Sequence, residues 1–158
     1  MKELPGKILL IDDEEYEKVL LEEALLDKQW VVDIAYFSST EQALKYLKET
    51  QDSIFIVLCD INMPKMSGLD FKKIIDQNYE LSKKALPFIF VSNGATQEQV
   101  QEAYSYRVQG YFQKPRSEKL QADMLDTIIR YWMINQHPNI HRNTSFSLGR
   151  DRSESSAV

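Results

Sequence analysis

Five polar residues stand behind short apolar runs, and together they carry the functional groups of one reaction. They are three carboxylates, a hydroxyl and an amine: Asp12, Asp13, Asp60, Ser92 and Lys114. Carboxylates that lie close together repel one another, and a hard divalent cation with oxygen ligands relieves this repulsion. Mg²⁺ suits such a site because it accepts one or two carboxylates, keeps several waters and can share a phosphate oxygen.

Phosphoryl transfer to an aspartate is the reaction that this set of groups would support. An ionised carboxylate can attack phosphorus and form an acyl phosphate. A cation and a lysine would neutralise the oxygens of the transferred group, and a serine hydroxyl would donate a hydrogen bond to one of them. The sequence therefore contains every part of an aspartyl-phosphorylation site, on condition that the fold gathers these residues in one place.

The apolar runs in front of these residues predict β-strands. Runs that are apolar at every position are typical of strands buried on both faces of a sheet. We expect strands over residues 8–11, 31–37, 54–59, 88–91 and 111–113. Apolar residues at helical spacing, some behind capping pairs, predict helices between these strands and after the last one. The expected helices cover residues 14–27, from 39 onward, 68–78, from 96 onward, and 117–134.

The alternation of strands and helices indicates an α/β fold with a parallel sheet, because helical crossovers join parallel neighbours. We expect a doubly wound five-stranded parallel sheet in a flavodoxin-like three-layer sandwich. In such sheets, ligands bind beyond the carboxyl ends of the strands, near the switch in strand order. The five polar residues follow their strands at this end, so the fold predicts that they converge.

Composition limits the class of protein. The chain has 158 residues, 43% of them hydrophobic and 27% charged, which fits one globular domain. One cysteine excludes an internal disulfide, and one cysteine with two histidines is too few for a zinc module. The longest unbroken apolar run, residues 54–59, is far shorter than the about 20 residues of a membrane-spanning helix. The net charge of −5 argues against a surface that binds nucleic acid. Because the N-terminus also lacks the apolar core of a secretory signal, we expect a cytoplasmic protein that binds neither nucleic acid nor membrane.

Four sequence motifs, in this order along the chain, resemble those of a known family. They are the acidic pair Asp12-Asp13, residues 60–68 (DINMPKMSG), Ser92, and Lys114-Pro115. The chain resembles the receiver domain of two-component response regulators over roughly residues 7–134, and the single-domain, chemotaxis-regulator-like class in particular. Each motif alone would be weak evidence, but the four together are highly specific.

The resemblance implies a Mg²⁺ site. By position, Asp13 would be a direct ligand, and Asp12 would act mainly through water. Asp60 would also belong to the ligand set, and Asn62 would add its backbone carbonyl.

The resemblance also assigns roles in phosphoryl transfer. Asp60 would be the phosphoacceptor, and Ser92 and Lys114 would bind the phosphoryl group. Tyr111, three residues before Lys114, would be the switch aromatic.

A protein of this kind is a phosphorylation-controlled signalling switch of a two-component phosphorelay and not a metabolic enzyme. The resemblance implies that a sensor histidine kinase or a phosphotransfer protein supplies the phosphoryl group. The receiver would catalyse its own phosphorylation and slow dephosphorylation. The surface of the fourth helix, fifth strand and fifth helix would then bind a downstream protein or a second copy of the chain. Because no effector domain follows, we expect the output to go through a separate protein.

Three residues depart from the family pattern. Asn93 follows the site hydroxyl at a position that is usually small, where it would crowd or bond the phosphoryl group. Arg107 and Val108 stand where the family often has Gly-Ala before the fifth strand.

Two other functions compete with the switch. The first is a receiver-like adaptor that binds a partner without being phosphorylated. The second is a Mg²⁺-dependent phosphatase resembling the haloacid dehalogenases, which place a second aspartate two residues after the nucleophile. Asn62 stands at that position here, which argues against the phosphatase.

The composition changes near residue 136, which predicts a receiver domain over residues 1–135 and a flexible tail over residues 136–158. The tail has few large apolar residues and cannot bury enough surface to order itself. We expect its two histidines, His137 and His141, to lie on the solvated surface.

Overall fold

The middle layer of the protein is a central sheet of five parallel strands in the order β4-β2-β5-β6-β7. The computed structural model describes residues 1–94 and 96–141. The strands are β2 (Lys7–Ile11), β4 (Ile34–Phe37), β5 (Ile54–Cys59), β6 (Phe88–Ser92) and β7 (Gly110–Gln113). Every residue of β5 is buried, as expected for the central strand of a sheet covered on both faces. The predicted fold, a doubly wound five-stranded parallel sheet of the flavodoxin-like kind, is confirmed.

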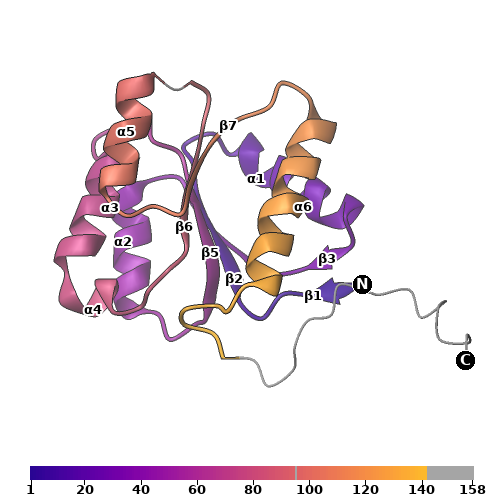
Figure 1. Ribbon diagram of the computed structural model, residues 1–158, viewed down its shortest axis with the longest axis horizontal. Coiled ribbons are helices and arrows are strands. Elements are labelled where there is room, and N and C mark those ends of the chain that lie inside the picture. Colours follow the sequence, from indigo (N-terminus) through magenta and orange to yellow (C-terminus); the bar gives the residue numbers. More distant parts are fainter. Residues whose placement is uncertain (95, 142–158) are drawn as a thin grey trace, which may run out of the picture.

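Helices cover both faces of the sheet (Figure 1). On one face lie α1 (Tyr16–Asp27) and α6 (Glu118–Ile134), and on the other lie α2 (Thr40–Glu49), α3 (Gly68–Gln77), α4 (Tyr79–Ser82) and α5 (Gln97–Ser105). The hydrophobic core accordingly has two halves, one on each side of the strands. Within the residues that the structure describes, no helix combines the length and the apolar character needed to cross a membrane.

The strand order changes direction between β2 and β5, which pair in parallel with Ile11 beside Cys59. From β2 the chain continues into α1 on one face, and from β5 it continues into α3 on the other face. The two loops therefore diverge at the carboxyl ends of these strands, which is where doubly wound sheets bind ligands. Asp12 and Asp60, the residues that follow β2 and β5, stand at this place.

The region expected to be one strand over residues 31–37 contains two strands. Trp30–Val31 forms β3, which pairs in parallel with β1 (Lys2–Glu3) in a separate two-stranded sheet, and Ile34–Phe37 forms β4. The Trp30 side chain is 3% exposed, and its Nε1 donates a hydrogen bond to Asp126 of α6. Packing against α6 therefore decides the conformation here, and the sequence pattern did not predict it.

The short helix α4 was also missed by the sequence analysis. Its first turn is capped by Asn78, whose side chain accepts a hydrogen bond from the Leu81 backbone N–H.

The segment after α6 packs against the domain, so the prediction of a solvated His137 is wrong. His137 is buried, and its Nε2 donates to the Phe55 carbonyl oxygen at 2.7 Å. Its Nδ1 accepts from the backbone N–H groups of Asn139 and Ile140. Asn139 in turn donates from Nδ2 to the carbonyl oxygens of residues 84 and 85. Hydrogen bonds to buried backbone groups order this stretch. The prediction of a flexible tail considered only the number of apolar residues and therefore missed these bonds.

The packed part of the chain therefore extends beyond the predicted domain boundary at residue 135. Ile140 is partly buried against the core between the sheet and α6, whereas His141 is exposed, as expected. The remainder of the predicted tail, residues 142–158, lies outside the described residues.

We predict that His137→Ala lowers the free energy of unfolding by about 2 kcal/mol, because it leaves the buried Phe55 carbonyl oxygen without its donor. Urea unfolding at neutral pH measures this change. His141→Ala is the matched control, since it removes the same side chain from an exposed position. Equal stabilities of the two variants would contradict the role given to His137.

Candidate functional site

The loop that follows β5 places Asp60 at the edge of the sheet. The Asp60 backbone N–H donates to the Ile11 carbonyl, which continues the pairing of β5 with β2. Gly68, at the start of α3, lies so close to this loop that an added Cβ would come within 2.3 Å of the Asp60 carbonyl oxygen. A residue with a side chain would push the loop away, so glycine is required there. Thr40 of α2 holds the other end of the loop by donating to the Met66 carbonyl at 2.7 Å.

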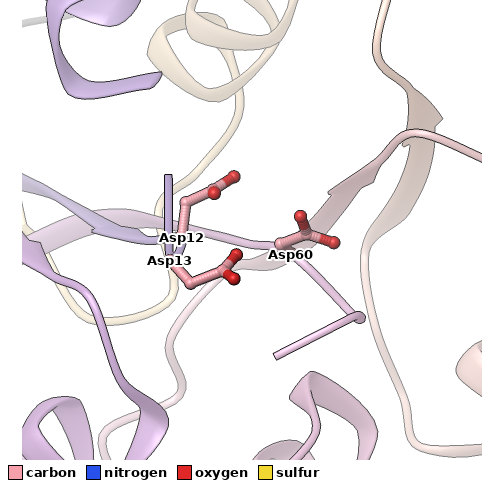
Figure 2. A group of neighbouring side chains, drawn as sticks. All are labelled: Asp12, Asp13 and Asp60. Carbon is pink, nitrogen blue, oxygen red and sulfur yellow. The ribbon is translucent and has the colours of Figure 1, made fainter. Parts of the chain in front are cut away.

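Three carboxylates meet at the carboxyl ends of β2 and β5 (Figure 2). Asp12, Asp13 and Asp60 each offer an oxygen, and these oxygens all lie within 4.8 Å of one another. Asp12 and Asp60 are buried, at 2% and 8% exposure, whereas Asp13 is exposed. The site is therefore open to solvent on the side of Asp13.

The Asp60 carboxylate is held by donors from three different parts of the chain. The Ser92 hydroxyl, at the end of β6, donates to Oδ1 at 3.0 Å, and the Asn62 backbone N–H donates to the same oxygen at 3.0 Å. Lys114 Nζ, just after β7, donates to Oδ2 at 3.3 Å. The Asn62 side chain is exposed and donates from Nδ2 to the Ser92 hydroxyl oxygen at 3.4 Å. These donors fix the orientation of the carboxylate and surround it with groups that favour anionic oxygens.

Lys114 lies among three carboxylates, and its side chain is only 6% exposed. Its Nζ is 2.7 Å from Asp12, 3.3 Å from Asp60 and 3.4 Å from Glu17. The Lys114 backbone N–H donates to the Ser92 carbonyl and so fixes the position from which the side chain starts. The five polar residues singled out in the sequence are thus brought together around one point.

Two further residues belong to this site, and sequence reasoning missed both. Glu17, in the first turn of α1, contacts Lys114, and Tyr36, in β4, donates from its hydroxyl to the Asp12 carbonyl at 2.7 Å. For Glu17 the sequence offered one signal: it follows Asp13 by four residues, which is about one helical turn. No sequence motif marks Tyr36, because its place depends on the pairing of β4 with β2.

Burial and neighbouring charges together shift the pKa values of Asp12 and Lys114. Burial raises the pKa of Asp12 to about 6, against the opposing effect of its hydrogen bond with Lys114. Burial alone would lower the pKa of Lys114, but the hydrogen bond and charge of Asp12, with the charges of Asp60 and Glu17, outweigh it and raise the pKa. Both shifts favour the proton-bound form, for Asp12 mainly because it is buried and for Lys114 because carboxylates surround it.

This set of groups fits a hard divalent cation. The ligand atoms on offer are carboxylate oxygens, which Mg²⁺ and similar cations prefer. A cation would also offset the charge that Lys114 leaves unbalanced. Exposed Asp13 can reach a hydrated ion without first breaking a buried contact, whereas both oxygens of Asp12 already accept hydrogen bonds, from the Glu14 backbone and from Lys114.

The other residues noted in the sequence lie around this centre. The Tyr111 side chain is partly buried against Phe90, and its hydroxyl donates to the Gly94 carbonyl at 3.1 Å. Asn93 is exposed. Arg107 has a φ of 59°, in the left-handed region that favours the glycine found there in the resembled family, and Val108 is buried in the core.

Comparison with known proteins identifies what this arrangement is similar to. The family model described as response regulator receiver domain matches residues 8–126. The chain is 34% identical over 128 residues to the chemotaxis protein CheY-3 of Vibrio cholerae, covering 77% of this chain and 90% of that protein. It is 30% identical over 124 residues to the transcriptional regulatory protein FlgR of Helicobacter pylori, covering 78% of this chain but only 29% of FlgR. The chain therefore spans less than a third of the length of that relative.

Solved structures give the same fold. The phosphorylated cyanobacterial phytochrome response regulator RcpA superimposes with a TM-score of 0.74 at 20% identity, covering 84% of this chain and 98% of that one. The Mn²⁺-bound form of response regulator Rcp1 superimposes with a TM-score of 0.70 at 23% identity, covering 81% and 94%. At this level of identity the likeness shows the fold alone.

We predict that Asp12→Asn stabilises the metal-free protein at pH 7.5 by about 2–3 kcal/mol. Because the folded-state pKa of Asp12 lies above its ordinary value of 3.8, its contribution to stability is fully present below pH 4 and is lost as the pH rises through about 6. The amide avoids this loss because it carries no charge.

Urea unfolding of both proteins in EDTA between pH 4 and pH 8 measures the difference. The gain should grow from pH 4 to pH 6 and then level off, while the exposed control Asp33→Asn should follow the wild type. A difference between Asp12→Asn and the wild type that does not vary with pH would contradict the assigned shift.

Proposed function

Because this chain belongs to the response regulator receiver domain family, we propose that it is a phosphorylation-controlled signalling switch in which Asp60 accepts the phosphoryl group. One observation carries the choice of Asp60. Its carboxylate is the one that Ser92, the Asn62 N–H and Lys114 all contact, and it lies beside the other two aspartates. A phosphoryl group on Asp60 would therefore meet donors and positive charge that are already in place.

In the proposed reaction, a carboxylate oxygen of Asp60 attacks the phosphorus of a phosphorylated donor. The new bond joins this oxygen to phosphorus, and the bond from phosphorus to the donor breaks, with its electron pair leaving on the donor atom. Asp60 then carries a mixed anhydride. Attack of water on the same phosphorus releases inorganic phosphate and restores the carboxylate, which returns the switch to its resting state.

The side chains of the site stabilise the transferred group. The Ser92 hydroxyl, now bonded to Asp60, can donate to a phosphoryl oxygen instead. Lys114, 3.3 Å from Asp60, supplies positive charge to another of these oxygens. Both groups are held by the ends of β6 and β7, so little reorganisation is needed when negative charge develops.

The family and the donor set support a divalent cation at this site, and Mg²⁺ is our proposal for it. Asp13 would bind the cation directly, and Asp12 would bind it mainly through water. The remaining protein ligands would be the Asp60 carboxylate and the Asn62 backbone carbonyl. When bound, the cation lowers the charge repulsion between the anionic donor and the aspartates. The Mn²⁺-bound form of Rcp1, a relative in fold, supports a divalent ion in such a pocket.

Phosphorylation would change the surface around Tyr111. A phosphoryl group adds about −1.5 to −2 charge at pH 7, which draws the Ser92 hydroxyl toward it. Movement of the loop after β6 would break the bond from Tyr111 to Gly94 and let the ring turn inward. The affected surface combines α5, β7 and α6, the family's fourth helix, fifth strand and fifth helix, and we propose it as the face for a downstream protein or a second copy.

The phosphoryl donor in this proposal is a sensor histidine kinase or a phosphotransfer protein in the cytoplasm. Family membership argues against the phosphatase alternative, because receivers accept a phosphoryl group and do not turn over phosphate esters. The adaptor alternative differs from the switch in one measurable respect, which is whether Asp60 becomes phosphorylated.

We predict that Asp60→Asn abolishes phosphorylation and leaves the fold intact. The amide keeps the size of the side chain but cannot act as the nucleophile, and it relieves carboxylate repulsion, so the stability should hold or rise. Mass spectrometry after treatment with acetyl phosphate and Mg²⁺ detects the added group. Asp70→Asn, at an exposed position in α3, should label like the wild type. Persistent labelling of Asp60→Asn would refute the assignment, and an unlabelled wild type would favour the adaptor.

Mg²⁺ affinity should fall more in Asp13→Ala than in Asp12→Ala, with about a tenfold loss or more in the first. A direct ligand loses a coordinate bond on mutation, whereas a residue acting through water loses an orienting contact. Calorimetric titration of Mg²⁺ into the two variants and the wild type measures the order. Equal or reversed losses would show that the two aspartates have other roles.

A further inference from the structure

Glu17 is a charged residue inside the site to which the proposed reaction gives no role. Its side chain is 14% exposed, although it belongs to the first turn of a surface helix. One carboxylate oxygen lies 3.4 Å from Lys114 Nζ, and the other accepts a hydrogen bond from Gln121 Nε2 of α6 at 3.2 Å. Glu17 thus joins the lysine of the site to a helix on the surface.

We propose that Glu17 is a positioning residue that competes with the phosphoryl group for Lys114 and conveys the phosphorylation state of Asp60 to α6. This inference rests on the proposed function of Asp60 as the phosphoacceptor. It concerns the contact between the start of α6 and α1, which lie together on one side of the sheet, whereas α5, the helix that lies nearest the Tyr111 loop, lies on the other side (Figure 1).

The competition follows from the three contacts of Lys114. The ammonium group of Lys114 donates hydrogen bonds to Asp12 and Asp60 and forms an ion pair with Glu17 at 3.4 Å. Of these, Asp12 and Asp60 belong to the acidic group suited to a cation. Glu17 lies outside that group, so it is the carboxylate whose ion pair still competes for Lys114 once the aspartates bind a cation. Its negative charge also opposes the approach of an anionic phosphoryl donor.

Phosphorylation of Asp60 shifts this balance. The charge of about −1.5 to −2 that the group adds attracts Lys114 more strongly than the original carboxylate did. Lys114 turns toward the phosphoryl oxygens, and Glu17 loses its cation. A largely buried carboxylate without a cation is unstable, so Glu17 must turn toward solvent.

The surroundings permit this movement and connect it to α6. A cavity of about 40 Å³ borders Glu17, Lys114 and Gln121 between the two helices and the sheet, which leaves room for the side chains to change rotamer. When Glu17 turns outward, its bond from Gln121 breaks. Two side-chain hydrogen bonds join the start of α6 to α1: Gln121 to Glu17, and Tyr16 to Glu118 at 3.3 Å, one turn earlier on α6. Outward movement of Glu17 breaks the first and leaves the second.

The test uses three variants of the full chain. Glu17→Gln keeps the size of the side chain and removes its charge. Gln121→Met removes the amide that bonds Glu17 and leaves the contact of Glu17 with Lys114. Glu15→Gln, an exposed position next to the same helix start, is the matched control for the change in net charge.

Two measurements separate the two parts of the proposal. The first is the rate of phosphorylation at sub-saturating acetyl phosphate with Mg²⁺, followed by mass spectrometry. We expect Glu17→Gln to react about three- to tenfold faster than the wild type, with the increase shrinking at high salt, and the two other variants to react at the wild-type rate. The second is hydrogen exchange of the first turns of α6, residues 118–124. Phosphorylation should speed it in the wild type and in Glu15→Gln, and should change it little in Glu17→Gln and Gln121→Met.

The outcomes are distinct. A wild type that gains no phosphoryl group would overturn the proposed function and this inference with it. A wild type that is phosphorylated at Asp60, with Glu17→Gln reacting at the same rate or slower, would overturn the competition for Lys114 alone. A phosphorylation response in α6 that persists in both Glu17→Gln and Gln121→Met would overturn the coupling alone.

Discussion

Lys114 and the carboxylates around it set the conditions under which the rest of this molecule works. Its ammonium group lies within 3.4 Å of Asp12, Asp60 and Glu17, with Asp13 close to two of them. One positive charge does not balance four negative ones, so the site favours further positive charge. Burial adds to this by raising the pKa of Asp12, which favours its protonated form. The same imbalance fits a divalent cation. In the proposed switch, a phosphoryl group on Asp60 would change which of these anionic groups binds Lys114.

The scaffold keeps these charges together although they repel. β2 and β5 are buried and pair along their lengths, so Asp12 and Asp60 cannot move apart without disturbing the core. The loop after β5 is fixed at both ends, by the close approach of Gly68 and by the bond from Thr40 to Met66. Hydrophobic burial in the sheet therefore holds an electrostatically unfavourable arrangement at its edge, as is common where a site is built for binding or reaction.

In the proposed switch, the two faces of the sheet offer two ways to report phosphorylation of Asp60. Tyr111 and the loop after β6 adjoin α5, whereas Glu17 and Gln121 adjoin α6 through polar contacts on the opposite side. α6 also carries the chain into the segment around His137, which packs against Phe55 of the central strand. A change at the start of α6 therefore acts on a helix whose other end is anchored to the core.

The sequence by itself determined the class of fold and five of the residues that meet at the site, because alternating buried strands and helices indicate a parallel sheet, in which the carboxyl ends of the strands share one edge. It determined the family for the same reason, since Asp12, Asp60, Ser92 and Lys114 each follow a strand at the required place. Tertiary structure alone decided what Glu17 and Tyr36 touch, because those contacts depend on how α1 rotates against α6 and how β4 pairs with β2. It also decided that His137 is buried, because the buried Phe55 carbonyl that it satisfies lies 82 residues away along the chain. Local patterns predict elements and their ends, whereas contacts between distant polar groups exist only once the chain has packed.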